Sequence, residues 1–151
     1  MAIPAAGRVL ALDWGERRIG LALSDESQII ATPLTTLTRR PGKRFPMPSF
    51  LVLVEAHRPV GCLVGLPLTP EGAEGPAARS ARDLANRIAR RTALPVELLD
   101  ERMTTARAEA AVREQGGSVR GRKGDLDALA AAVLLQGFLE QRRGGGSREA
   151  R

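Results

Sequence analysis

Four acidic residues, drawn from three separate parts of the chain, are the residues best suited to catalysis. Asp13 stands where an apolar run ends, Asp100 and Glu101 follow a second apolar run, and Asp127 lies in the first turn of the last predicted helix. The apolar sequence before each acid should bury it, and clustered buried carboxylates need cations or protons. If the fold brings them together, they could hold two divalent cations about 4 Å apart and support hydrolysis of a phosphodiester.

Each of these acids also has a structural explanation. Asp13 could close an Asx-turn over Gly15, and Asp100 could end its strand in the same way. A carboxylate in a first helical turn, as expected for Asp127, is favourable to the helix dipole without any metal. The sequence leaves these alternatives open for each acid taken alone, and the combination of the acids favours a metal site.

The metal that such a site would hold is limited by the few nitrogen and sulfur ligands in the chain. His57 is the only histidine and Cys62 the only cysteine, and Cys62 lies in an apolar run that we predict to be core. Any metal site must then be built from carboxylates, which suits magnesium or manganese better than zinc. We therefore expect Mg²⁺ or Mn²⁺ as the cofactor.

Basic residues outnumber acidic ones and indicate a partner that carries phosphate. The formal net charge is +6, and all but two of the 23 basic residues are arginines, whose guanidinium groups grip phosphate oxygens in a bidentate manner. A general bias towards arginine would explain this ratio but not the basic clusters at 39–44 and 120–123. We expect nucleic acid as the partner, bound by its backbone and shape, since three phenylalanines and one tryptophan leave little for base stacking.

Hydrophobic patterning predicts an α/β fold in which the acids share one edge of a sheet. The first three strands should form an antiparallel meander and the last two should enter by helical crossovers, which makes a central mixed five-stranded sheet flanked by helices. Ligands gather at the carboxyl ends of parallel strands, where Asp13 and the Asp100–Glu101 pair are placed. Strands are predicted at about 8–14, 19–24, 28–37, 60–68 and 95–100, and helices at about 49–58, 76–91, 105–115 and from 125 onwards.

Local features refine this order of elements. Pro33 cannot donate a hydrogen bond to a neighbouring strand, so the third strand should lie at an edge or become irregular midway. Residues 69–76 are rich in glycine and proline and predict a flexible loop or lid. Asp125 is a plausible cap for the last helix, in which an apolar stripe runs from Leu126 to Phe138.

The chain, at 151 residues, is long enough for one domain with a core of its own. We assign residues 1–141 to this domain and expect residues 142–151, which hold three consecutive glycines and scattered charge, to form a disordered basic tail. No apolar run approaches the roughly 18 residues of a membrane helix, and the first residues lack the pattern of a signal peptide. A cytoplasmic location with no membrane partner is therefore expected.

Several short motifs, taken in their order and spacing, carry a family resemblance. They are Leu12-Asp13-Trp14-Gly15 with Arg18-Ile19-Gly20-Leu21-Ala22, Val64-Gly65-Leu66-Pro67-Leu68 followed by Gly72, Asp100-Glu101-Arg102-Met103-Thr104-Thr105-Ala106, and Lys123-Gly124 with Asp127-Ala128 and Ala130-Ala131. Over roughly residues 8–141 the chain resembles the YqgF/RuvX family. Its members are ribonuclease H-like proteins described as Holliday junction resolvases and as nucleases that mature the 5′ end of pre-16S ribosomal RNA.

The resemblance implies a ribonuclease H-like fold with an acidic metal site. It makes Asp13, Asp127 and one acid of the Asp100–Glu101 pair the catalytic residues and metal ligands. Because neighbours on a strand point to opposite faces, we favour Glu101 and keep both. In the related resolvases a glutamate occupies the strand that here ends in Gly65-Leu66-Pro67-Leu68. That acid is missing, so the Asp100–Glu101 pair would have to supply it.

The implied partners of the nucleic acid are basic side chains. The resemblance makes Arg18, Arg102 and Lys123 phosphate partners, and Arg120 and Arg122 of the neighbouring basic cluster join them as nucleic-acid-binding residues.

These observations predict a metal-dependent nuclease that hydrolyses phosphodiester bonds in pre-16S rRNA processing, with RNA favoured over branched DNA on the resemblance alone. The nearest alternative is a Holliday junction resolvase, which would normally need a homodimer to cut two strands symmetrically, so both a monomer and a homodimer stay open. A third alternative is a catalytically silent nucleic-acid-binding protein, whose function would survive Asp13→Asn. An ATPase module of the actin type fits poorly, because the chain is too short for a second lobe.

Overall fold

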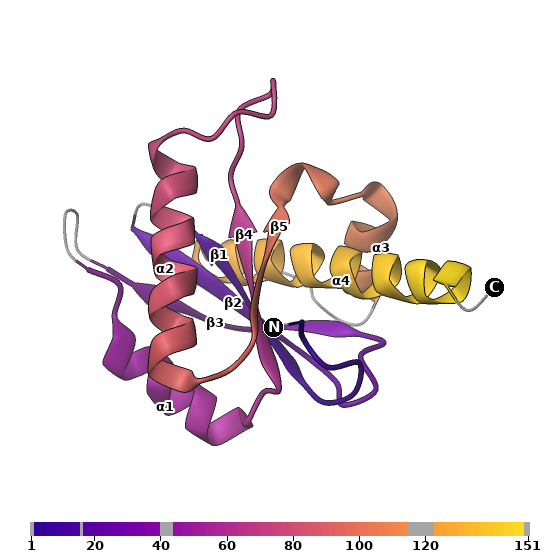
Figure 1. The fold of residues 1–151 in the computed structure, drawn as a ribbon, viewed down its shortest axis with the longest axis horizontal. Helices are drawn as coiled ribbons and strands as arrows, with labels where there is room; N and C mark the ends of the chain where they lie inside the picture. The colour runs from indigo at the N-terminus through magenta and orange to yellow at the C-terminus, as the bar shows by residue number, and fades with distance from the viewer. Residues whose placement is uncertain (1, 16, 40–43, 115–122, 150–151) are drawn as a thin grey trace.

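A mixed sheet forms the centre of the structure (Figure 1). The computed structural model describes residues 2–15, 17–39, 44–114 and 123–149, except for the side chains of residues 103, 123–125 and 145–149. Within these residues β1 pairs antiparallel with β2 and β2 with β3, whereas β4 runs parallel to β1 and to β5. The five strands, in the spatial order β3-β2-β1-β4-β5, are β1 (Val9–Trp14), β2 (Arg18–Ser24), β3 (Ala31–Thr38), β4 (Gly61–Leu66) and β5 (Val96–Asp100). The predicted α/β fold with its mixed five-stranded sheet is confirmed.

The middle strand, β1, is covered on both faces. Its residues from Val9 to Leu12 have no exposed surface, because β1 has neighbours on both sides and helices above and below. Cys62 on the adjacent β4 is equally buried, as predicted for a core cysteine, and burial raises the pKa of its thiol to about 12. Asp13 is the first residue of β1 that is only half-buried, so it lies near the carboxyl end of the strand, where side chains reach solvent.

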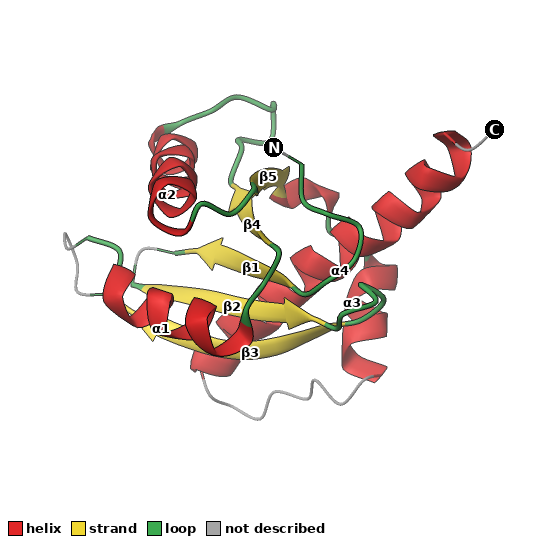
Figure 2. Ribbon diagram, turned by 60° about the horizontal axis from the view of Figure 1, so that its bottom comes forward, coloured by secondary structure: helices red, strands yellow, loops and turns green. Residues whose placement is uncertain are grey.

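Helices cover both faces of the sheet in the described part of the chain (Figure 2). On one face α1 and α2 pack against the side chains of Leu10 and Leu12. On the other face α3 and α4 pack against those of Val9 and Ala11, as the alternation along a strand requires. The helices are α1 (Met47–His57), α2 (Pro76–Thr92), α3 (Ala106–Glu114) and α4 (Lys123–Glu149).

Pro33 lies on β3, which is an edge strand, as its missing amide hydrogen predicted. The register between β2 and β3 shifts at this point, since Leu21 pairs with Thr35 whereas Ala22 pairs with Pro33 itself. The shift leaves one residue of β3 without an opposite partner, which is the geometry of a β-bulge. Both expectations for this strand are therefore met.

The backbone of α4 crosses β2 at Gly20. A methyl group at this position would overlap the main-chain carbonyl of Asp127 and come within 2.8 Å of the nitrogen of Ala128. Gly20 is also the residue of β2 that pairs with Asp13 of β1. The absence of a side chain at Gly20 therefore sets how close α4 can bring Asp127 to the end of β1.

Replacing Gly20 by alanine should lower the free energy of unfolding by about 2–3 kcal/mol, because the new methyl group must push backbone atoms apart. Gly75→Ala is the matched control: a methyl group there would meet no atom within 4 Å, and the backbone of Gly75 is extended. Urea denaturation of both variants measures the effect. Equal midpoints for Gly20→Ala and the wild type would contradict the close crossing.

The last helix differs from its prediction at both ends. Asp125 was expected to cap it, but α4 already includes Lys123, so Asp127 lies beyond the first turn. Residues 142–149 were expected to be disordered, yet α4 continues to Glu149. The reason lies partly in two arginines: Arg142 donates to the carbonyl of Ile3 at 2.8 Å, and Arg143 donates to that of Ile29 at 3.3 Å. The division into a domain of residues 1–141 and a tail stays a prediction.

No helix in the described ranges is both long and apolar enough to cross a membrane.

Candidate active site

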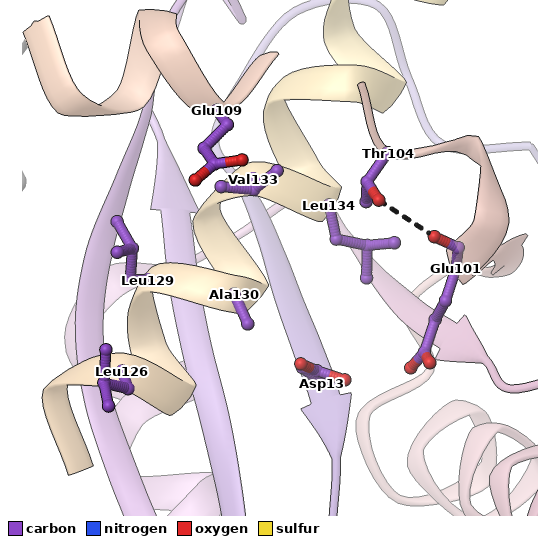
Figure 3. Close-up of a pocket in the computed structure, with 9 residues that line it drawn as sticks. All are labelled: Asp13, Glu101, Thr104, Glu109, Leu126, Leu129, Ala130, Val133 and Leu134. Carbon is purple, nitrogen blue, oxygen red and sulfur yellow. Dashed lines mark hydrogen bonds between the residues drawn. The ribbon is translucent and has the colours of Figure 1, made fainter. Parts of the chain in front are cut away.

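Asp13 and Glu101 face each other in a pocket at the edge of the sheet (Figure 3). The pocket has a volume of about 390 Å³ and lies between the end of β1 and α4. Asp13 comes from β1, while Glu101 comes from the short 3₁₀-helix η1 (Glu101–Met103) that follows β5. The two carboxyl groups line the same pocket, and the charge of Asp13 raises the pKa of Glu101.

Asp100 positions this turn instead of joining the pair. Its carboxylate accepts a hydrogen bond from the backbone nitrogen of Arg102 at 2.9 Å, which caps η1. The guanidinium of Arg102 donates to the same carboxylate, at 2.7 Å from Nη2 and 3.0 Å from Nε. Thr104 closes the turn by donating to the carbonyl of Glu101 at 3.1 Å. The structure therefore brings Glu101 to Asp13 and keeps Asp100 outside the pocket.

Gly65 on β4 leaves the space that Glu101 occupies. A methyl group on Gly65 would lie 2.7 Å from the Glu101 Oε1 atom and 3.0 Å from the side chain of Leu134. An acidic side chain on β4 could not stand here together with Glu101. The carboxylate that the sequence lacks on this strand is thus replaced in space by one that enters from the end of β5.

Burial and mutual repulsion perturb both acids. The pKa of Glu101 is raised to about 8, most of all by burial and then by the neighbouring Asp13 carboxyl group and the charge of Asp100. Burial is also the largest cause that raises the pKa of Asp13; the neighbouring Glu101 carboxyl group lowers it, and the charge of Asp127 raises it. At neutral pH the pair therefore holds a proton, and a cation is needed to ionise both carboxyl groups.

Asp127 lies near this pair but is turned towards Arg18. The Nε atom of Arg18 donates to its carboxylate at 2.6 Å, and about a third of each side chain is exposed. Within the described residues no three His, Cys, Asp or Glu side chains are close enough together to hold a metal ion. The structure thus brings together two of the three expected metal ligands, Asp13 and Glu101. The third, Asp127, is paired with Arg18. A partly exposed ion pair of this kind stabilises a protein by about 0–1 kcal/mol, so Arg18 and Asp127 can each change partners with little loss of free energy.

The expected phosphate partners differ in their surroundings. Arg18 is paired with Asp127, and Arg102 is held by Asp100 and also donates to the carbonyl of Pro70 at 3.3 Å. Arg120 and Arg122 lie outside the described residues, and so does the side chain of Lys123. No phosphate role is tested by these contacts, and all of these assignments stay predictions.

The segment expected to be a flexible loop or lid forms a closed turn beside Arg102. Leu68 and Glu74 pair as an antiparallel bridge, and Thr69 is bonded to Ala73 across the turn, backbone to backbone, at 2.9 Å. The carboxylate of Glu74 accepts two hydrogen bonds from Arg82 of α2, at 2.6 and 2.7 Å. These paired contacts explain why the glycine- and proline-rich stretch is ordered.

Several residues of the pocket were not predicted to belong to a site. Leu126 was assigned to the apolar stripe of the last helix, but 54% of it is exposed. Glu109 belongs to the exposed side of α3, and nothing in its neighbourhood in the sequence marks it. The unpredicted lining residues are Thr104, Glu109, Leu126, Leu129, Ala130, Val133 and Leu134.

Comparison with known proteins identifies the family. The model of a family described as "RuvX: Holliday junction resolvase" matches residues 7–141. The chain belongs to the RuvX family. A RuvX relative from Anaeromyxobacter sp. (strain Fw109-5), named "Putative pre-16S rRNA nuclease", is 45% identical over 135 residues, which cover 89% of this chain and 98% of that protein. A relative of the same name from Mycolicibacterium smegmatis is 41% identical over 145 residues, with 93% of this chain and 84% of the relative covered.

Solved structures show the fold of the RuvX chain. The structure described as T. thermophilus RuvC in complex with Holliday junction substrate matches with a TM-score of 0.62 and 18% identity, over 91% of this chain and 96% of that one. A second Thermus thermophilus RuvC structure gives the same TM-score at 17% identity. The predicted ribonuclease H-like architecture is confirmed.

Proposed function

We propose that this RuvX protein is a divalent-metal-dependent nuclease that hydrolyses phosphodiester bonds, with the 5′ end of pre-16S rRNA as its substrate. The observation that carries the proposal is the pair of carboxyl groups, Asp13 and Glu101, that line one pocket at the end of the central strand. The family description and the names of the curated relatives support nuclease activity. Those names also favour RNA as the substrate.

The donor set fits a magnesium or manganese ion. Such ions prefer oxygen ligands, and Mg²⁺ is usually bound through one or two carboxylates together with water and substrate phosphate. Asp13 and Glu101 offer two carboxylates that repel each other when both are ionised, and a dication between them removes that repulsion. When bound there, the cation would polarise the scissile phosphate and make an attacking water more acidic.

Arg18 and Asp127 complete the proposed site by exchanging partners. The guanidinium of Arg18 now binds the Asp127 carboxylate at 2.6 Å, and an incoming phosphate presents the same kind of oxygen pair. If Arg18 moves to the phosphate, Asp127 is released towards Asp13, whose pKa its charge already raises. We propose that Asp127 becomes the third ligand in this way, while Arg18 holds the substrate.

One experiment separates the possible substrates. The purified protein is incubated with labelled single-stranded and structured RNA and with four-way DNA junctions, in Mg²⁺, Mn²⁺ or a chelator. We expect cleavage of RNA that needs either metal and is lost with the chelator. Cleavage that persists in the chelator would contradict the carboxylate and metal site.

A Holliday junction resolvase is the second candidate function. The family description and the fold shared with RuvC favour it. Cleavage of the four-way junction alone would establish this candidate and refute the RNA assignment. Symmetrical cuts would then call for a dimer, which sedimentation of the protein with and without the junction measures. The cytoplasmic location and the choice between monomer and homodimer stay predictions.

A further inference from the structure

The pocket beside the carboxylates has a largely apolar wall that the proposed cleavage chemistry does not use. This wall is formed by one side of α4, and Thr104 and Glu109 add polar groups at the rim of the pocket (Figure 3). No Lys or Arg side chain among the described residues lines it. The apolar residues of this wall are Leu126, Leu129, Ala130, Val133 and Leu134.

The exposure of Leu126 shows that part of this apolar wall is accessible to solvent. Leu126 is 54% exposed, and it is one of only a few large apolar side chains of the described residues that are exposed, together with Ile29 and Val52. Ile29 and Val52 lie outside this pocket. An exposed leucine beside a catalytic site loses contact with water when an apolar group of a ligand covers it, which favours binding.

The part of the substrate that binds this pocket must suit an apolar wall, and it must be attached to the phosphate that the proposed nuclease cuts. A phosphate is disfavoured against this wall, because its side chains are apolar, Glu109 at its rim is a carboxylate, and no described Lys or Arg lines the pocket. A nucleobase is suited, because its flat faces are apolar. A cavity of about 390 Å³ is at the small end of ligand pockets, so it has room for one nucleoside and not for a paired base.

Glu109 supplies a means to distinguish bases. Its Oε1 atom accepts a hydrogen bond from Arg113 at 2.7 Å, one turn along α3, and its Oε2 atom has no partner among the described residues. Glu109 lies away from Asp13, across the apolar wall (Figure 3). A carboxylate accepts from the exocyclic amino group of a base and is repelled by an exocyclic carbonyl.

We propose that this pocket binds one unpaired nucleobase next to the phosphate that is cut, and that Glu109 favours bases with an exocyclic amino group over uracil. The inference rests on the proposed nuclease function. It specifies the substrate further: the nucleotide at the cut must be single-stranded or turned out of a duplex, because a stacked and paired base cannot enter the pocket.

The first test compares cytosine with uracil, which differ at one exocyclic group. Oligo(C) and oligo(U) RNA are titrated, by fluorescence anisotropy, into the Asp13→Asn protein, so that binding is measured whether or not the wild type cuts. We expect about fivefold or stronger binding of oligo(C). Glu109→Gln, added to this protein, should bring the ratio close to one, because an amide can also donate to a carbonyl. Glu114→Gln, on the same helix, is the control and should leave the ratio unchanged.

The second test concerns the apolar wall. Leu126→Ala should weaken the binding of an oligonucleotide about fivefold or more, whereas Val52→Ala, which shortens an even more exposed apolar side chain outside the pocket, should not. On an oligonucleotide with abasic sites in place of bases, Leu126→Ala should have no effect. Equal binding of oligo(C) and oligo(U), an unchanged ratio in Glu109→Gln, or the same loss on abasic RNA would overturn the inference.

The two tests distinguish a failure of the base-pocket inference from a failure of the nuclease proposal. A wild type that cuts RNA while Glu109→Gln and Leu126→Ala bind normally would refute the base pocket and leave the nuclease function standing. A wild type that cuts nothing, with the expected base preference in binding, would refute the nuclease function and support a base-binding pocket.

Discussion

The Asp13→Asn protein should cleave RNA on the order of a thousandfold more slowly than the wild type in saturating Mg²⁺ or Mn²⁺. The reason is the position of Asp13. It follows the buried core of β1, it lines the same pocket as Glu101, and its pKa is raised by burial and by the charge of Asp127. Asparagine keeps the shape of the side chain but removes the negative charge on which the proposed cation depends.

Single-turnover cleavage measures this loss, and circular dichroism checks that the variant is folded. Asp83→Asn is the matched control, because Asp83 is an exposed aspartate of α2 outside the pocket. Its rate should equal that of the wild type. If Asp13→Asn kept more than about a tenth of the wild-type rate, Asp13 could not be the central ligand, and the alternative of a catalytically silent nucleic-acid-binding protein would gain support.

The order of elements and the place of Asp13 could be predicted because both depend on local patterns. A continuous apolar run predicts a strand covered on both faces, and β1 is that strand. Pro33 has no amide hydrogen to donate to a neighbouring strand, which predicts an edge strand, and it lies on the edge strand β3. The end of a buried strand is where a polar side chain first reaches solvent, so the position of Asp13 alone predicted that it lies at the carboxyl end of β1.

The partner of each acid could not be predicted, because it depends on side chains far away in the chain. Asp127 is paired with Arg18 across 109 residues, and that contact exists only because Gly20 lets α4 approach β2. Glu101 reaches Asp13 through a 3₁₀ turn and over the bare backbone of Gly65, whereas the sequence suggested a simple strand end. Alternation along a strand correctly separated Asp100 from Glu101, although the turn, capped by Asp100, is what separates them in the structure.

The limit of a periodic pattern is visible in α4. Leu126 shares its spacing with buried residues such as Leu134, so the pattern assigned both to the core. The structure separates them: Leu134 is 2% exposed, and Leu126 extends to the wall of the pocket. Periodicity shows which side of a helix is apolar, but not how much of that side the sheet covers.

A second large effect is expected on stability in the absence of metal. Glu101→Gln should be more stable than the wild type at pH 9, by about 1–2 kcal/mol, and of similar stability at pH 5. The folded protein raises the pKa of Glu101 to about 8, whereas the unfolded chain ionises this group near its ordinary value of about 4.3. Between these two values the folded state holds a proton that the unfolded state has lost, so the free energy of unfolding falls as the pH rises.

The magnitude stays well below the full pKa shift, because Glu101 is only half-buried and water screens its charge. Urea denaturation of both proteins at pH 5, 7 and 9, in a chelator, measures the difference as a function of pH. A difference that does not grow with pH would mean that Glu101 ionises freely beside Asp13. Adding Mn²⁺ at pH 9 should then stabilise the wild type more than Glu101→Gln, since the ion binds the folded pair and the amide offers it no charge. A Glu101 that destabilises the metal-free protein and that a cation stabilises is what a metal site requires, because the ion would not stabilise a purely structural Glu101.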